Sequence, residues 1–93
     1  MFRLALARVS KPRAILRGHA NYLTALAFHP DGKILASASH DRTIKLWDMA
    51  TGEVRLTLEG LDAGLTTLAF TPDGNLLISC DQNGGVKLWR SNR

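Results

Sequence analysis

Residues 23–32 have the sequence LTALAFHPDG, and residues 65–74 repeat it as LTTLAFTPDG, 42 positions later. The tripeptide Lys-Leu-Trp occurs at 45–47 and, in the same register, at 87–89. Alignment of residues 18–51 with residues 60–93 needs no gap and gives 14 identities in 34 positions. A fixed period of this size is typical of stacked supersecondary units, each of which cannot bury its apolar surface alone.

Each repeat divides into short β-strands separated by turn residues. The turns are predicted from Gly, Pro and Asp, because Pro presets φ and Gly accepts a positive φ. Both sides of the predicted strands are apolar, which favours sheets that are covered on both faces. The sequence therefore predicts an all-β fold, with strands at 23–28, 34–39, 43–47 and 54–58, a corresponding strand at 86–89, and one at 14–17 before the first repeat.

The pair Gly18-His19, followed by Leu46-Trp47-Asp48, matches the Gly-His and Trp-Asp signature of WD40 repeats. The chain thus resembles the WD40 family, strongly over residues 18–93. This resemblance implies two four-stranded antiparallel blades of a β-propeller. Because propellers close with about 4–8 blades, two blades form an incomplete ring. The predicted organisation is a basic segment at 1–13, a remnant of an eroded blade, followed by repeats at 14–55 and 56–93.

Composition limits the classes of function. The net charge of +4 comes from the N-terminal segment, because residues 18–93 hold 7 basic and 8 acidic residues. A nearly neutral body argues against a broad nucleic-acid-binding face. The single cysteine, Cys80, allows no internal disulfide, and we expect a reducing, cytoplasmic location. No apolar run approaches the roughly 20 residues that cross a bilayer, so we expect no membrane partner.

Four residues of the first repeat provide a candidate site with two interpretations. His19, Ser37 and Asp41 are the residue types of a hydrolytic triad. The family resemblance instead implies a structural hydrogen-bond tetrad of these three with Trp47, in which Ser39 is an alternative to Ser37. No Gly-x-Ser-x-Gly motif surrounds either serine, so we favour the tetrad and expect no enzymatic activity. In the second repeat Leu61 replaces His19 and Asn83 replaces Asp41.

The histidines lack the spacing of zinc ligands, and we expect neither a metal nor a cofactor. We expect a protein-interaction scaffold whose first partner is itself, with three or four chains closing the ring. A protein or peptide would also bind the loop face. Two alternatives remain: a fragment of a longer propeller without an independent function, or a nucleic-acid-binding protein that uses the basic tail. The loop-face residues implied by the resemblance are Asn21, Tyr22, His40, Arg42, Asp62 and Gln82.

Overall fold

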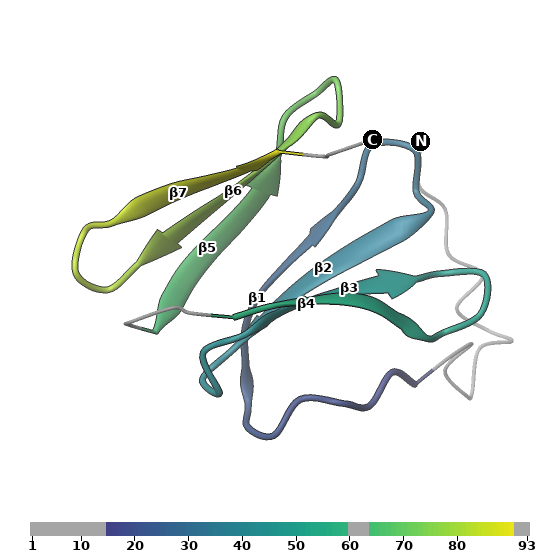
Figure 1. The fold of residues 1–93 in the computed structure, drawn as a ribbon, viewed down its shortest axis with the longest axis horizontal. Helices are drawn as coiled ribbons and strands as arrows, with labels where there is room; N and C mark the ends of the chain where they lie inside the picture. The colour runs from purple at the N-terminus through teal and green to yellow at the C-terminus, as the bar shows by residue number, and fades with distance from the viewer. Residues whose placement is uncertain (1–14, 60–63, 91–93) are drawn as a thin grey trace, which may run out of the picture.

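A computed structural model of the chain describes residues 15–59 and 64–90, and its regular structure there is entirely β-strand. The first sheet has the order β1-β2-β3-β4 and the second β5-β6-β7, with all neighbouring strands antiparallel (Figure 1). The predicted all-β class is confirmed, with four strands in the first sheet and three in the second within this part of the chain. The strands are β1 (Leu23–Phe28), β2 (Ile34–Ser39), β3 (Ile44–Asp48), β4 (Val54–Leu58), β5 (Leu65–Phe70), β6 (Leu76–Asp81) and β7 (Val86–Arg90).

The repeated Pro-Asp-Gly sequence builds the same hairpin turn twice. In the β1–β2 turn, Asp31 Oδ1 accepts a hydrogen bond from the Lys33 amide at 2.8 Å. In the β5–β6 turn, Asp73 Oδ1 accepts one from the Asn75 amide at 2.9 Å. The glycine of each turn has φ +75°, a left-handed conformation that side chains with a Cβ rarely adopt. The turn chemistry therefore fixes where β2 and β6 begin.

Three predicted strands differ from the structure. Strand β3 ends at Asp48 rather than at residue 47, and β7 ends at Arg90 rather than at residue 89. Strand β3 begins at Ile44 rather than at residue 43, because the Thr43 amide and hydroxyl both donate to the Asp41 carboxylate in the preceding turn. The predicted strand at 14–17 is wrong for residues 15–17, which have no regular secondary structure, and residue 14 lies outside the described residues. The corresponding residues of the second repeat lie at the end of β4, where β3 offers them a pairing edge.

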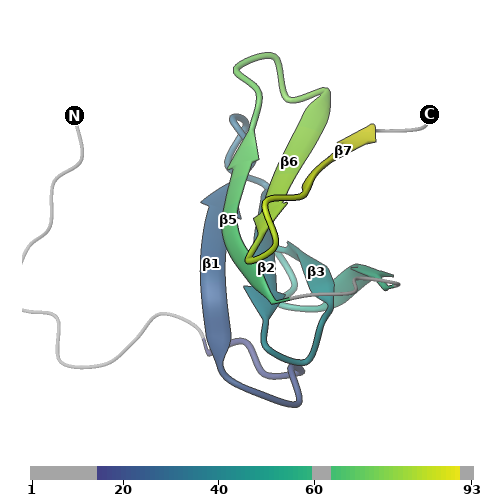
Figure 2. The same ribbon diagram turned by 90° about the vertical axis from the view of Figure 1, so that its left-hand side faces the viewer.

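The two sheets stack face to face, with β1 and β2 against β5 (Figure 2). Successive side chains of a strand point to opposite faces, and the first sheet turns its alanines toward the second. The small alanines leave room for leucines of the opposite sheet, so the sheets approach closely. The buried core consists of Ala36, Ala38 and Ile44 from the first sheet and Leu65, Leu68 and Leu77 from the second.

Each sheet has a second apolar face outside this contact. We call the outer face of the first sheet the Trp47 face; it carries Leu26, Phe28, Leu35, Ser37 and Trp47. We call the outer face of the second sheet the Leu88 face; it carries Ala69, Ile78, Cys80, Val86 and Leu88. Leu26 and Phe28 on the first face and Val86 and Leu88 on the second are more than half exposed. Trp47 itself lies against Gly18 and His19 and is 3% exposed. Among residues 15–59 and 64–90, one face of each sheet is thus covered by the other sheet, and the second face keeps large exposed side chains.

Candidate functional site

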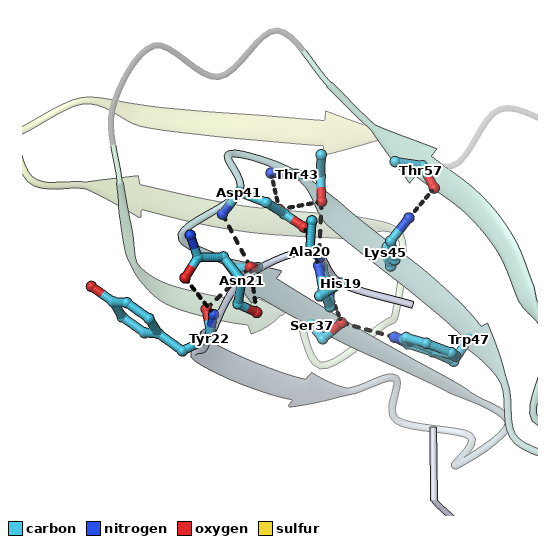
Figure 3. A network of polar contacts seen from close by, with 11 residues as sticks. His19, Ala20, Asn21, Tyr22, Ser37, Asp41, Thr43, Lys45, Trp47 and Thr57 are labelled. Atoms are coloured by element: carbon cyan, nitrogen blue, oxygen red, sulfur yellow. Dashed lines mark hydrogen bonds and ion pairs between the residues drawn. The ribbon is translucent and has the colours of Figure 1, made fainter. Parts of the chain in front are cut away.

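Four side chains from separate elements form one hydrogen-bonded chain in the first repeat (Figure 3). The Trp47 indole Nε1, on β3, donates to Ser37 Oγ on β2 at 2.8 Å. Ser37 Oγ lies 2.6 Å from His19 Nε2, in the segment before β1. His19 Nδ1 lies 3.0 Å from Oδ2 of Asp41, in the β2–β3 turn.

The direction of each hydrogen bond in this tetrad follows from its two ends. An ionised carboxylate accepts only and an indole nitrogen donates only. The proton of neutral His19 therefore lies on Nδ1, facing Asp41, and Nε2 accepts from the Ser37 hydroxyl. The hydroxyl oxygen in turn accepts from Trp47. Every donor in the tetrad meets an acceptor, which is the condition for burying polar groups without a large penalty.

The Asp41 carboxylate is the anchor of the network. Its Oδ1 accepts the Thr43 hydroxyl at 2.6 Å and the Thr43 amide at 2.9 Å, and its Oδ2 accepts the Ala20 amide at 3.0 Å. Burial disfavours the charged form, but the hydrogen bonds from Thr43, Ala20 and His19 outweigh it and hold the pKa of Asp41 well below its ordinary value. The ionised carboxylate thus fixes the segment before β1 onto the β2–β3 turn.

The same geometry argues against nucleophilic catalysis. The Ser37 hydroxyl, the His19 imidazole and the Asp41 carboxylate have the order of a hydrolytic triad. A nucleophile must reach its substrate, but Ser37 is only 2% exposed and its oxygen is engaged by Trp47. Ser39 is equally committed: its hydroxyl lies 3.1 Å from the Tyr22 carbonyl and accepts the Asp41 amide. The arrangement is suited to joining a loop, a strand and a turn.

Gly18 permits the tryptophan to lie in this position. A Cβ at residue 18 would come within 3.1 Å of the Trp47 ring, closer than ordinary packing allows. Beside this contact the Trp47 face is hollowed by an open cleft of about 320 Å³. Its apolar lining includes Leu16, Leu26 and Leu35.

The second repeat keeps only part of the network. The Trp89 indole donates to Ser79 Oγ at 3.0 Å, as Trp47 does to Ser37. Leu61, which replaces His19, lies outside the described residues. Asn83, which replaces Asp41, donates through its backbone amide to Asp81. Asp81 Oδ1 also accepts the Gly85 amide at 2.8 Å, so this carboxylate holds the β6–β7 turn.

Sequence reasoning missed three polar contributors: Thr43, Asp81 and His29. The Asp-x-Thr and Asp-x-x-x-Gly spacings are signals for the first two, because Asp commonly bonds backbone groups within its own turn. His29 has no signal in the repeat, where Thr71 occupies its position. The His29 Nε2 donates to the Gly74 carbonyl at 3.0 Å. The His29 and Phe70 rings pack edge to face, with their centroids 5.1 Å apart. This contact links the two sheets.

The predicted loop-face residues divide into two groups. Tyr22 and His40 stack with ring centroids 4.8 Å apart and planes 12° from parallel. Both residues are exposed, as are Asn21 and Arg42. Gln82 is exposed on the second repeat, and its backbone amide donates to the Gly64 carbonyl. Asp62 lies outside the described residues.

Within residues 15–59 and 64–90, no set of three or more His, Cys, Asp or Glu residues is arranged to hold a metal ion. The three histidines instead lie in the tetrad, at the contact between sheets and in the Tyr22 stack. In the same residues, no helical segment reaches the length and hydropathy that a bilayer crossing requires.

Antiparallel blades stacked face to face, the first of them tied by a His-Ser-Asp-Trp tetrad, define a class of propeller-forming repeats. The chain belongs to the WD40 family: the family model described as WD domain, G-beta repeat matches residues 10–48 and 52–90. The predicted family and the presence of two repeats are confirmed.

Several larger proteins have segments similar to this chain. Nuclear distribution protein PAC1 of Coprinopsis cinerea is 55% identical over 51 residues, which are 50% of this chain and 12% of that protein. Target of rapamycin complex subunit wat1 of Schizosaccharomyces pombe is 50% identical over 44 residues, which are 47% of this chain and 14% of that protein. Coronin-7 of Mus musculus is 42% identical over 53 residues, which are 56% of this chain and 6% of that protein. The matches thus span only 6% to 14% of these relatives.

Proposed function

We propose that the chain is a non-catalytic protein-interaction scaffold whose WD40 blades bind further copies of themselves, three or four chains closing a propeller ring. The observation that supports this proposal is the pair of open apolar faces. Soluble monomers rarely expose contiguous apolar patches larger than a few hundred Å². Both outer faces carry large exposed side chains, and each belongs to a sheet whose other face is already covered.

Matched positions of the two repeats indicate what should cover these faces. Leu68 is 7% exposed against the first sheet, whereas its counterpart Leu26 on the Trp47 face is 57% exposed. Ile44 is fully buried against the second sheet, whereas its counterpart Val86 on the Leu88 face is 62% exposed. In the covered contact, the leucine-rich face of the second sheet thus packs on the alanine-rich face of the first sheet. By repeat position, the exposed Trp47 face corresponds to the leucine-rich face. The exposed Leu88 face corresponds to the alanine-rich face.

The open faces are therefore complementary to each other, and the Trp47 face of one copy is suited to the Leu88 face of the next. This contact is head-to-tail, because the two surfaces differ. Head-to-tail contacts form a ring when the rotation between copies closes. With two blades per chain, three or four chains give six or eight blades, within the range of about 4–8 blades that propellers use.

Light scattering coupled to size-exclusion chromatography tests this association on the full chain. We expect a particle of three or four times the 10.2 kDa chain mass. Leu26→Asp and Leu88→Asp should each yield a monomer, because each places a charge in one of the two faces. Leu56→Asp is the matched control: it replaces a 50% exposed leucine on the outer strand β4 and should leave the assembly intact. A wild-type monomer at micromolar concentration would contradict self-association.

The relatives bear on the alternative that these repeats act only within a longer propeller. The relative from Schizosaccharomyces pombe is by name a complex subunit, which favours protein binding over catalysis for such repeats. The match covers a small part of that protein. A stable monomer in the scattering experiment would favour this alternative for the present chain.

A second binding function, for another protein or peptide, is supported by the Tyr22–His40 stack. Tyrosine and arginine are enriched among residues that dominate binding energy at interfaces, and Tyr22 and Arg42 are both exposed. The Arg42 backbone has φ +70°, which orients this residue within a short turn. A Tyr22→Ala, Arg42→Ala variant should lose a captured partner while keeping the wild-type particle mass. Retention of that partner by the variant would argue against the loop face.

A further inference from the structure

His29 makes a contact across the boundary between the two sheets. It follows β1, which lies beside β5 of the second sheet (Figure 2). The His29 Nε2 donates to the carbonyl of Gly74, in the β5–β6 turn, at 3.0 Å. Its imidazole ring packs edge to face with Phe70, the last residue of β5. We call these two interactions the His29 contact, and they fasten the end of the first blade to the second.

The turns on both sides of the boundary support the His29 contact. In its own turn, His29 Nδ1 accepts the Asp31 amide at 3.2 Å, which orients the imidazole ring. Across the boundary, a Cβ at residue 74 would overlap the same ring. The imidazole therefore reaches the carbonyl only because this residue is glycine. Gly74 is buried and Phe70 is half-buried, so the His29 contact is close and largely covered.

The proposed contact between copies has another residue in the position of His29. A shift of 42 places Thr71 of one copy at this position. The same shift places Phe28 and Gly32 of the next copy at the positions of the phenylalanine and glycine that receive the histidine. In the head-to-tail arrangement, the threonine of one copy thus faces Phe28 and Gly32 of the next. Both repeats contain the receiving residues, and only the first contains the histidine.

Thr71 cannot reproduce the His29 contact. Its hydroxyl donates to Asp73 Oδ1 at 2.6 Å and accepts the Leu76 amide at 3.2 Å, so it is engaged within its own turn. The threonine side chain is also shorter than that of histidine and has no aromatic ring. The contact between copies therefore lacks both the hydrogen bond and the aromatic pair that the contact within the chain has.

The residues that would receive a histidine are accessible on the first sheet. Phe28 is 59% exposed, whereas its counterpart Phe70 is half-buried beside His29. Gly32 is exposed, whereas its counterpart Gly74 is buried. A Cβ at residue 32 would meet no atom of the described residues within 4 Å. The turn at Gly32 thus leaves space for an imidazole ring from another copy.

We propose that residue 71 sets the strength of the association between copies, and that its threonine makes the copy–copy contact the separable one. His29 fastens the two blades of one chain, whereas Thr71 leaves a neighbouring copy held by apolar burial alone at this end of the sheets. The assembly then dissociates between chains before a chain loses its internal contact. This inference rests on the proposed head-to-tail association and identifies the residue that limits it.

The variant Thr71→His supplies the missing interactions between copies. It gives the second turn the sequence His-Pro-Asp-Gly that residues 29–32 already have, so we expect the turn to be kept. A gained hydrogen bond and aromatic pair should lower the dissociation constant of the copy–copy contact roughly tenfold. Analytical ultracentrifugation of the full chain over a dilution series measures this constant.

Two further variants show whether the gain comes from the proposed contact. Thr71→Asn is the matched control, because asparagine bonds its own turn but has no ring, and it should leave the dissociation constant unchanged. In a Phe28→Leu background, Thr71→His should gain less, since the histidine then has no aromatic partner in the neighbouring copy.

The variant His29→Thr tests the contact within the chain. It gives the first turn the residue that the second turn has. Urea unfolding at a concentration where the chain is monomeric should show a folding equilibrium constant roughly tenfold lower than that of the wild type. An unchanged constant would overturn the role of the His29 contact, and this measurement decides even when Thr71→His does not fold.

The outcomes separate this inference from the association on which it rests. If the wild type assembles and a Thr71→His variant that is folded by circular dichroism dissociates at the same concentration, the role of residue 71 is overturned and the association remains. If both proteins stay monomeric, both proposals are overturned. If only Thr71→His assembles, residue 71 limits association as proposed, and self-association of the natural chain is overturned.

Discussion

The first repeat buries the face formed by its alanines, and the second buries the opposite face, formed by its leucines. The two repeats share their turns, their tryptophan and most of their strand residues, so the sequence of one repeat does not determine which face is covered. The neighbouring sheet does. A leucine at the same repeat position is buried in one sheet and exposed in the other. The difference shows that these blades stabilise one another through unlike faces.

The polar networks of the two repeats also differ, and the network of the first repeat joins more elements. In the first repeat the hydrogen bonds run from Trp47 through Ser37 and His19 to Asp41, across four elements of the chain. In the second, Trp89 donates to Ser79, while Asp81 accepts the amides of Asn83 and Gly85 in its own turn. The first blade is thus tied together by its polar groups, whereas the second depends more on its contact with the first.

The largest effect should come from the matched leucines. Leu68→Ala removes a buried side chain from the contact between sheets and should lower the free energy of unfolding by about 2–5 kcal/mol at every protein concentration. Leu26→Ala, at the equivalent open position, should cost much less at low concentration and gain importance only as copies associate. Urea unfolding at two protein concentrations measures both. Equal, concentration-independent losses would remove the distinction between the two faces.

The matched tryptophans should differ by less. Trp47→Phe removes the donor to Ser37 and leaves a buried hydroxyl without it, at a cost of roughly 1–3 kcal/mol. For a domain of this size each kcal/mol lowers Tm by about 4–8 °C. Trp89→Phe should cost less in packing, because the Trp89 ring is only half-buried, whereas Trp47 is 3% exposed. Differential scanning calorimetry compares the two variants, and a Trp47→Phe protein that melts with the wild type would count against a stabilising tetrad.

Much of the fold follows from local residues. The Pro-Asp-Gly turns and the apolar strands predicted β1, β2 and β4 at the observed bounds, because turn chemistry acts over a few residues. Residues 15–17 were predicted wrongly, since a strand needs a pairing edge and the sequence of one repeat does not show whether the edge is present. The start of β3 was shifted by the bonds of Thr43 to Asp41.

The candidate site was accessible to sequence reasoning only where the repeat signature covers it. His19, Ser37, Asp41 and Trp47 lie at signature positions, and the structure brings them into one network. The His29 bond to Gly74 joins residues of different repeats, and a pattern within one repeat contains no information about such a pair. The exposure of each face was also not predictable residue by residue, since it depends on how the sheets stack.

The last comparison concerns Asp41, which the second repeat replaces with Asn83. Both carboxylate oxygens accept hydrogen bonds, one from the Thr43 hydroxyl and amide and the other from Ala20 and His19. Asp41→Asn replaces one of these oxygens with an NH2 donor, which leaves two of the four donors without an acceptor, and at neutral pH it should cost roughly 1–3 kcal/mol. The lowered pKa of folded Asp41 means that its ionised form stabilises the fold above the ordinary value of 3.8. That contribution is lost as the pH falls below this value toward the lower folded pKa. Urea unfolding of both proteins from pH 7 to pH 2.5 should therefore give a difference that is constant above about pH 5 and shrinks below about pH 4. The other carboxylates cancel in this difference, so a gap that stays unchanged in acid would show that the Asp41 charge does not hold the tetrad.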